Sequence, residues 1–398
     1  MESMMPTTDT TAATTAKPRR RLAVCQVADA GPLESLVQML STAGYDCVIP
    51  DDPLRAELQR TYGNNAGLVL SPRELTRGMG YDPVDVPEGS PQSMEVCDLF
   101  VDIKAHQVYP ALVRRWPRLV GKVLWYRING GEPEHTVNAR GDHGDEVCPP
   151  CPVLTPNQWY GEVDDRLRSR VEPLPGGGFT GPRVERNVRY RGVPKLTRQR
   201  SFCCWPPFAR IAEYDPGQRP ADSGRYGPPI CLIHNVKGWG YHDLIDPLRK
   251  LGVKVYGRGS PDGLLTHRDA KEMLKTSLCM VHLKSSDAPG YALYEALAAG
   301  CPVVCTGRLI WRCHMEALLE PGVTCLTFDR RQSHDGLTAD QVRQDTDDVA
   351  YYLKALADPR FNRLIGNGGR QRLERVMWGG PAGEVRFRAW MGQMFDLG

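Results

Sequence analysis

The chain has 398 residues, a length that suits two domains of ordinary size. Apolar residues make up 41% of the sequence and charged residues 24%, which is the composition of a globular protein. The formal net charge of +3 is too small to indicate a polyanionic partner for the chain as a whole. The sequence contains no run of about 18 apolar residues, so it predicts no membrane span.

The first 20 residues are rich in Thr and Ala and lack the apolar stretch of a signal peptide. We therefore expect residues 1–20 to form a flexible tail. The 13 cysteines are odd in number, and many lie in apolar, strand-like runs. This usage predicts reduced thiols and a cytoplasmic location.

Four cysteines are candidates for a structural zinc site: Cys148, Cys151, Cys203 and Cys204. Two adjacent cysteines rarely ligate one zinc ion, and two prolines separate Cys148 from Cys151. We therefore expect free thiols rather than zinc at these positions.

Strand and helix patterns alternate in the first half of the chain. Residues 21–27 form an apolar run, a turn with Gly31 follows, and residues 33–43 carry apolar side chains on one helical face. Further strands are expected at residues 46–50, 97–103, 122–126 and 152–155, and a helix at residues 110–116. Strand, turn, helix and strand in this order form a βαβ unit, which predicts a parallel sheet.

The segment of residues 166–210 is strongly basic, with eleven Lys or Arg side chains against Glu172 and Glu185. It is rich in Gly and Pro and has no periodicity, so we expect long loops with one hairpin. Aromatic side chains are interleaved with the basic ones: Phe179, Tyr190, Phe202, Trp205 and Phe208. Two interpretations stay open, a segment that binds nucleic acid and a basic loop that is solvated or contacts an acidic glycan.

Residues 214–229 are rich in Pro, Gly and Asp, which is the composition of a linker. The alternation restarts after it, with strands expected at residues 230–234, 253–256, 278–283, 302–306 and 323–328. Helices are expected at residues 242–251, 268–276, 291–299, 339–357, 362–376 and 383–394. The sequence thus predicts an α/β protein with two Rossmann-like domains, at residues 21–213 and 230–380, that face each other across a ligand-binding cleft.

The stretch SSDAPGYALYEALAAGCPVV, residues 285–304, carries the strongest functional signal. A strand leads into a loop with Gly290, and a helix then opens with Tyr291 and Ala292 and carries Glu295. Backbone N–H groups at a helix start suit a phosphate, and glycine lets a ligand approach closely. The Glu295 carboxylate is suited to the hydroxyls of a ribose. The alternative interpretation is an ordinary turn followed by charges that favour a helix start.

This stretch resembles the signature of the retaining GT-B glycosyltransferases of the sucrose-synthase and bacterial mannosyltransferase type. The signature has two glutamates separated by seven residues, with a glycine three residues after the first, and then a Pro-Val-Val strand. The matching positions are Asp287, Gly290, Glu295, Gly300, Pro302, Val303 and Val304. The first acid is Asp instead of Glu, which is one methylene shorter. The resemblance implies a GT-B fold, with a C-terminal helix at residues 381–398 that packs back toward the first domain.

Two further turns resemble the same family. Lys237-Gly238 follows the first strand of the second domain, where the family carries a lysine that binds the donor diphosphate. Gly257 and Arg258 follow the second strand in the position of a Gly-x-Gly turn. The arginine that the family carries before the lysine is missing, and His234 and Arg258 are the candidates to substitute for it. The resemblance covers residues 230–394 well and the first half of the chain only in architecture.

Four residues of the first domain are candidates for contacts with the acceptor or the sugar: Gly31, Arg127, Asn129 and His135. Gly31 lies in the turn after the first strand, and the other three follow the strand expected at residues 122–126. The ends of such strands face the cleft in this fold. An ordinary surface histidine is the alternative for His135.

The resemblance implies that a hexosyl or pentosyl group moves from a nucleoside diphosphate to an acceptor hydroxyl with retention of configuration. Asp287, Glu295 and Lys237 would be the catalytic residues, with no prosthetic group and no metal. The only Asp-x-Asp pattern, Asp345-Thr346-Asp347, falls inside an expected helix instead of at a strand end.

The acceptor stays open among a glycan, a small molecule and a hydroxylated base in DNA. Some phages encode transferases of the last kind, in which case the location would be the host cytoplasm and the base would be flipped out of the duplex. The competing hypothesis is a non-catalytic protein of the same fold that binds a nucleotide sugar.

Overall fold

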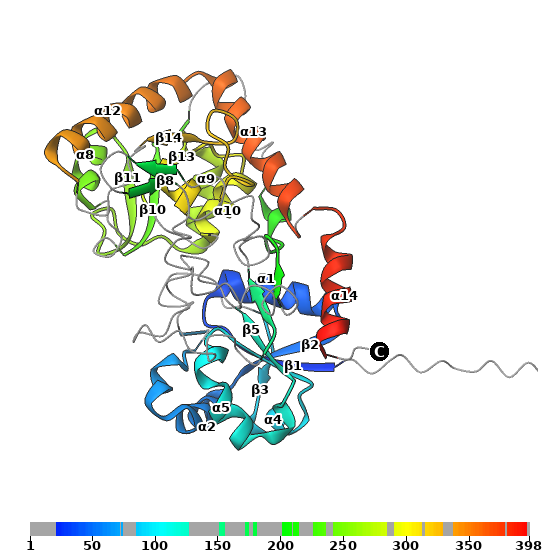
Figure 1. Ribbon diagram of the computed structural model, residues 1–398. Helices are drawn as coiled ribbons and strands as arrows, with labels where there is room; N and C mark the ends of the chain where they lie inside the picture. The colour runs from blue at the N-terminus through cyan, green and yellow to red at the C-terminus, as the bar shows by residue number, and fades with distance from the viewer. Residues whose placement is uncertain are drawn as a thin grey trace, which may run out of the picture.

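The computed structural model describes residues 21–71, 73–74, 85–126, 151–155, 172–174, 178–180, 201–208, 210–214, 226–235, 242–284, 290–312, 315–328, 337–378 and 380–395. In these ranges the chain forms two α/β domains, each built on its own parallel sheet. Figure 1 shows the first domain in blue and cyan below the second, which runs from green to orange. The two-domain α/β architecture predicted from the alternation of strands and helices is confirmed.

Within the described ranges, the first domain contains a seven-stranded parallel sheet with the order β3-β2-β1-β4-β5-β6-β9. The strands are β1 (Arg21–Gln26), β2 (Tyr45–Pro50), β3 (Glu88–Gly89), β4 (Leu99–Asp102), β5 (Val123–Tyr126), β6 (Val153–Thr155) and β9 (Ser201–Cys203). The helices are α1 (Ala30–Thr42), α2 (Asp52–Tyr62), α4 (Pro91–Val96) and α5 (Ala105–Arg115), with short 3-10 turns η1 (Gly63–Leu68), η2 (Pro117–Leu119) and η7 (Ile211–Glu213).

The second domain contains, among the residues described, a five-stranded parallel sheet with the order β11-β10-β12-β13-β14. The strands are β10 (Ile230–Asn235), β11 (Lys254–Arg258), β12 (Met280–His282), β13 (Val303–Thr306) and β14 (Leu326–Phe328). The helices are α8 (Ile245–Lys250), α9 (His267–Thr276), α10 (Tyr291–Ala298), α11 (Gly307–Arg312), α12 (Ala339–Leu356) and α13 (Pro359–Val376), and the 3-10 turn η9 (His242–Leu244) precedes α8.

The last helix, α14 (Gly383–Phe395), packs against α1 of the first domain, and Figure 1 shows it in red beside that domain. Phe387, Trp390 and Met391 enter the apolar core formed with α1 and β1. The chain therefore crosses from the second domain back to the first. None of the helices in the described ranges has the length and apolar character needed to span a bilayer.

The first sheet separates two apolar cores because successive side chains of a strand point to opposite faces. Ala23 and Cys25 of β1 belong to the core with α1 and α14, whereas Val24 belongs to the core with α2 and α5. A sheet buried on both faces needs strands that are apolar throughout. This is why the strands are recognisable in the sequence as short continuous apolar runs.

The helices of the C-terminal half begin at recognisable capping residues. Thr338 and Gln341 exchange hydrogen bonds between side chain and backbone in a capping box at the start of α12. Asp358 caps α13, and Pro359 occupies the first helical position, where its missing N–H is not needed. α13 therefore begins at Pro359, three residues before the helix that the apolar periodicity predicts.

The structure corrects three expectations about the first domain. The basic segment contains the predicted hairpin, formed by β7 (Glu172–Leu174) and β8 (Gly178–Thr180), but its end also forms β9 and joins the main sheet. The pattern does not predict α2. α5 begins at Ala105 instead of residue 110 and includes Pro110, because Val108 and Leu112 pack together in the same core.

Asp102 ends β4 as a buried carboxylate that is 1% exposed. The hydroxyl of Tyr62 donates to its Oδ2 (2.5 Å), and the backbone N–H of Lys104 donates to its Oδ1 (2.5 Å). Burial raises the pKa of Asp102 to about 6, although both hydrogen bonds act in the opposite direction.

Because the pKa of Asp102 is raised on folding, ionisation of this carboxyl destabilises the folded state. Its stabilising contribution is complete below pH ~4 and is lost as the pH rises through ~6. We expect the free energy of unfolding of the parent, relative to Asp102→Asn, to fall by about 2–3 kcal/mol over this range. Urea unfolding of both proteins at several pH values measures the difference. A difference that is independent of pH contradicts the raised pKa.

Candidate functional site

The second sheet has its topological switch point at β10. β11 lies on one side of β10 and β12 on the other. Because these strands are parallel, the chain leaves β10 and β12 at the same edge of the sheet. Ligands of open α/β sheets bind at such a point, beyond the carboxyl ends of the strands. The loops after β10 and β12 hold Lys237, Gly238 and Asp287, which lie outside the described residues. The sequence signature and the topology therefore indicate the same edge of the sheet.

α10 begins directly after the second of these loops. Gly290 is its N-cap, and the Gly290 carbonyl accepts hydrogen bonds from the N–H groups of the third and fourth helical residues (2.8 and 3.2 Å). The N–H groups of Tyr291 and Ala292 precede this ladder, and no side chain in the described part of the chain caps them. These donors and the positive end of the helix dipole favour an anion such as a diphosphate.

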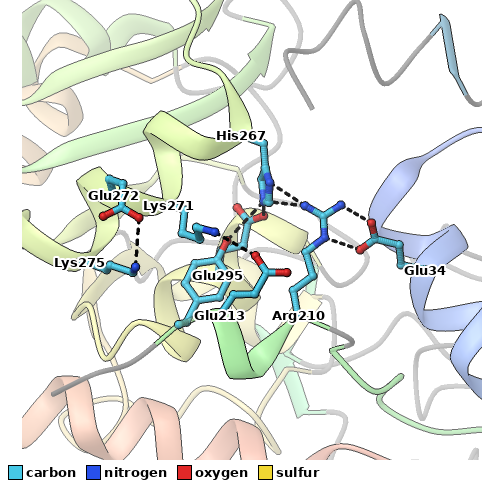
Figure 2. A network of polar contacts seen from close by, with 9 residues as sticks. Glu34, Arg210, Glu213, His267, Lys271, Glu272, Lys275 and Glu295 are labelled. Carbon is cyan, nitrogen blue, oxygen red and sulfur yellow. Dashed lines mark hydrogen bonds and ion pairs between the residues drawn. The ribbon is translucent and has the colours of Figure 1, made fainter. Parts of the chain in front are cut away.

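Glu295 lies in the second turn of α10, where Figure 2 shows it in a row of polar side chains. Its Oε1 lies 2.7 Å from Nε2 of His267, the first residue of α9, and 5% of its side chain is exposed. Nη1 of Arg210 lies 2.6 Å from Nδ1 of the same ring. The Arg210 guanidinium also donates to both carboxylate oxygens of Glu34 on α1. Polar contacts therefore run from a helix of the first domain to Glu295 in the second.

These contacts fix the protonation pattern of the row. Arg210 can only donate, and its Nη1 lies 2.6 Å from Nδ1 of His267 and 3.2 Å from Nε2. The shorter contact assigns the accepting role to Nδ1, which leaves the ring proton on Nε2 for the hydrogen bond to Glu295. Burial lowers the pKa of Arg210, but its hydrogen bonds and charge interaction with Glu34 outweigh burial and raise the pKa above its ordinary value. The row thus combines a cation, a neutral imidazole and two carboxylates. His267 engages Oε1 of Glu295 and leaves Oε2 outside this contact.

The two domains touch where α1 meets α10. A Cβ atom on Gly31 would lie 2.4 Å from the ring of Tyr291, so this approach requires glycine. The hydroxyl of Tyr291 donates to Oγ of Ser35 (2.6 Å), and Ser35 donates to the carbonyl of Pro207 (2.6 Å). Burial raises the pKa of Tyr291, which keeps its phenol neutral. Gly31 and Tyr291 were predicted from opposite halves of the chain as ligand contacts, and the structure brings them into contact with each other.

Gly257 and Arg258 lie at the end of β11, beside the end of β10. Gly257 has φ +149°, and a Cβ atom there would lie 1.7 Å from the carbonyl oxygen of Ile233. Glycine is therefore required for close packing of β11 on β10, whatever ligand binds nearby. Arg258 is exposed and pairs in register with Asn235, the last residue of β10.

Three candidates for acceptor contacts, Arg127, Asn129 and His135, lie outside the described residues. Among the described residues, the switch point of the first sheet lies between β1 and β4, which end at Gln26 and Asp102. Both side chains are 1% exposed, and the Gln26 amide donates to the carbonyl of Leu70 (3.0 Å).

No pattern in the sequence points to His267, Arg210 or Glu34 as site residues. His267 lies 57 residues from Arg210, and Arg210 lies 176 residues from Glu34, so no local motif joins them. Arg210 was counted in the basic segment, where its charge alone gave no indication of an ion pair. One local signal was present, because Thr266 caps α9 and places His267 at a helix start.

The described ranges contain no group of three or more His, Cys, Asp or Glu side chains arranged to hold a metal ion. Cys151 and Cys204 are both buried but belong to the cores on opposite faces of the first sheet, so they cannot ligate one zinc ion together. Cys148 and the side chain of Cys203 lie outside the described part of the chain. Asp345 lies inside α12, as predicted, so the Asp-x-Asp pattern does not follow a strand.

Two parallel-sheet α/β domains and a last helix that returns to the first domain define the GT-B fold. Sucrose-phosphate synthase from Thermosynechococcus elongatus has a similar structure, with a TM-score of 0.52 and 15% sequence identity over 95% of this chain and 98% of that chain. The predicted fold class is therefore confirmed.

Two further structures are similar at lower scores. The glycotransferase of kitacinnamycin has a TM-score of 0.46 and 13% identity over 95% of this chain and 100% of its own. The lipopolysaccharide outer core galactosyltransferase WaaB has a TM-score of 0.45 and 12% identity over 94% of this chain and 99% of its own. No protein-family model and no curated protein sequence matches the chain.

Gly31→Ala tests the contact between α1 and α10. The added Cβ overlaps the Tyr291 ring, and such overpacking typically costs about 1–3 kcal/mol of folding free energy. Gly67→Ala is the matched control, because nothing lies within 4 Å of the added atom. Chemical denaturation of the parent and the two variants measures the effect. Equal stability of the two variants contradicts the close contact.

Proposed function

We propose that this chain is a glycosyltransferase that moves a sugar from a nucleoside diphosphate to an acceptor hydroxyl with retention of configuration. One observation supports this proposal above the others. The segment of residues 287–295, which carries the glycosyltransferase signature, joins β12 to α10 at the switch point of the second sheet, in a chain with the GT-B fold.

The proposed donor site is formed by the second domain. Lys237 and the N–H groups of Tyr291 and Ala292 stabilise the negative charge that develops on the leaving diphosphate. Asp287 orients the donor sugar, and Glu295 binds the ribose. A site of this kind works by positioning the reactants and by stabilising charge.

The residues around this centre have supporting roles. Gly238 and Gly290 let the diphosphate approach the backbone closely, and Gly257 keeps the end of β11 packed against β10 so that Arg258 lies near the switch point. Arg258 then supplies a second positive charge for the diphosphate.

The proposed acceptor site lies in the first domain, at the strand ends that face the second. Arg127, Asn129 and His135 follow β5 and are the candidates for acceptor contacts, whereas Gly31 keeps the two domains in contact. A glycan and a small molecule suit such a site, and so does a hydroxylated base of DNA. The charge of residues 166–210 is the observation that favours DNA.

Glu295→Gln tests the donor site. A hydrogen bond to a carboxylate is about twice as strong as a neutral one, so we expect at least a tenfold loss of affinity for the preferred nucleotide sugar. Titration calorimetry with UDP-, GDP- and ADP-glucose measures it. Glu320→Gln, which removes the ion pair between Arg372 and the half-exposed Glu320, is the control and should bind as the parent does.

Two outcomes of these measurements contradict the proposal. Unchanged affinity of Glu295→Gln removes this residue from the donor site. A parent that binds a nucleotide sugar but neither hydrolyses it nor transfers the sugar is a binding protein of the same fold. Retention is checked separately by proton NMR of the anomeric centre in the first product formed.

Replacement of Arg186, Arg189, Arg191 and Arg198 by Gln tests the DNA hypothesis. If the basic segment binds DNA, the affinity of the parent for duplex or single-stranded DNA falls steeply with salt, because each neutralised phosphate releases counterions. The variant should then show a flatter salt dependence and unchanged donor affinity. Filter binding at low and physiological salt measures both proteins. Absence of DNA binding at low salt leaves a glycan or a small molecule as the acceptor.

A further inference from the structure

The buried His267 lies between the carboxylate of Glu295, in the proposed donor site, and the guanidinium of Arg210. We propose that His267 is a positioning residue, which holds Glu295 in the orientation that accepts the hydroxyls of the donor ribose. Arg210, anchored by Glu34, holds His267 in turn. This inference rests on the proposed function, because it concerns the nucleotide part of the same donor site.

The contacts of His267 give its ring one orientation. The residue is 5% exposed, and its Nε2 lies 2.7 Å from Oε1 of Glu295. Nη1 of Arg210 lies 2.6 Å from Nδ1 and, less closely, 3.2 Å from Nε2. The hydroxyl of Tyr214 lies 3.4 Å from the same nitrogen, Nε2. A ring rotated by half a turn would present carbon atoms to both the carboxylate and the guanidinium. The imidazole is therefore fixed in its direction as well as in its tautomer.

The imidazole of His267 leaves more of the Glu295 carboxylate available than a direct ion pair with Arg210 would. A guanidinium commonly binds a carboxylate through two parallel hydrogen bonds and occupies both oxygens. Arg210 forms such a pair with Glu34, whereas Glu295 receives one hydrogen bond from a neutral ring. Glu295 thus gains a partner in a buried position and keeps its negative charge and its Oε2 for a ligand. This arrangement suits a carboxylate that must accept hydroxyl groups.

The row of contacts that ends at Glu295 is anchored by Glu34, which lies in the first domain. Glu34 belongs to α1, which contacts α10 through Gly31 and Tyr291. Both side chains of the pair are largely buried, with exposed fractions of 14% for Arg210 and 19% for Glu34, so solvent screens the pair little. The orientation of Glu295 is therefore linked to the packing of α1 on the second domain, as the row of contacts in Figure 2 shows.

The test compares ribonucleotides with their 2′-deoxy forms. Affinities of UDP, GDP and ADP and of dUDP, dGDP and dADP are measured by titration calorimetry for the parent, His267→Leu and His267→Gln. We expect the parent to prefer the ribose form of its best nucleotide by at least about tenfold, since the deoxy form loses a charge-assisted hydrogen bond. His267→Leu should reduce this preference below about threefold. His267→Gln should restore most of it, because its amide both donates and accepts.

Lys271→Met is the matched control. Lys271 lies on the same helix as His267 and binds Glu213 across the same boundary, but it does not contact the ring. Its ribose preference should equal that of the parent. A general weakening of the fold would lower the affinity of both nucleotide forms equally, so only the ratio of the two affinities reports on positioning.

The outcomes separate the inference from the proposed function. Full ribose preference in folded His267→Leu overturns the inference, provided that Glu295→Gln loses the preference. A parent that binds none of the six nucleotides overturns the proposed function together with the inference. Thermal melting establishes that each variant is folded. If His267→Leu does not fold, Arg210→Met replaces it, because removal of the guanidinium frees both the tautomer and the direction of the ring. Full preference in that variant overturns the inference as well.

Discussion

The close approach of α1 and α10 is the constraint on which the arrangement of the two domains depends. Each helix follows a strand beside the switch point of its own sheet, so their first turns meet between the domains. Because Gly31 has no side chain, the Tyr291 ring can pack directly against its backbone. Two helix starts that converge concentrate positive potential, which a bound anion relieves. The same geometry brings Glu34 within reach of Arg210 and so determines the surroundings of Glu295.

The segment that leaves the first domain is held by the second. Trp205, Phe208 and Tyr214 belong to the apolar core around α10. One guanidinium, that of Arg370 on α13, donates to the carbonyls of Ile211 and Tyr214 and to that of Ala298 at the end of α10. It therefore caps a helix C-terminus and fixes the start of the linker at the same time. Arg210 lies within this segment, so its position is determined from both domains.

Most of the fold could be predicted from the sequence because both sheets are buried on both faces. Strands such as β1 and β13 then carry runs of apolar residues that face both sides of the sheet, and the helices between them show one apolar face. β9 is not predictable from the sequence because its three residues lie within the long basic segment, and only their pairing with β6 makes them a strand. Local composition does not contain that information.

The candidate site, too, has one part that the sequence predicts and one part that it does not. Glu295 and the start of α10 belong to one local pattern and were predicted, because strand, loop and helix follow each other within a few residues. His267, Arg210 and Glu34 are ordinary residue types that meet only after two domains have packed. Gly257 was assigned to a ligand, yet the carbonyl of Ile233 alone already requires glycine there. Long-range packing and steric requirements of the backbone are the two kinds of information that the motif lacks.

The return of α14 to the first domain has a consequence for biosynthesis. Phe387, Trp390 and Met391 complete a core whose other walls are β1 and α1, which are among the earliest parts of the described chain to leave the ribosome. That core cannot close until the whole second domain has been translated. Until then the first domain exposes the apolar surface that α14 later covers, and exposed apolar surface of this kind is what chaperones bind.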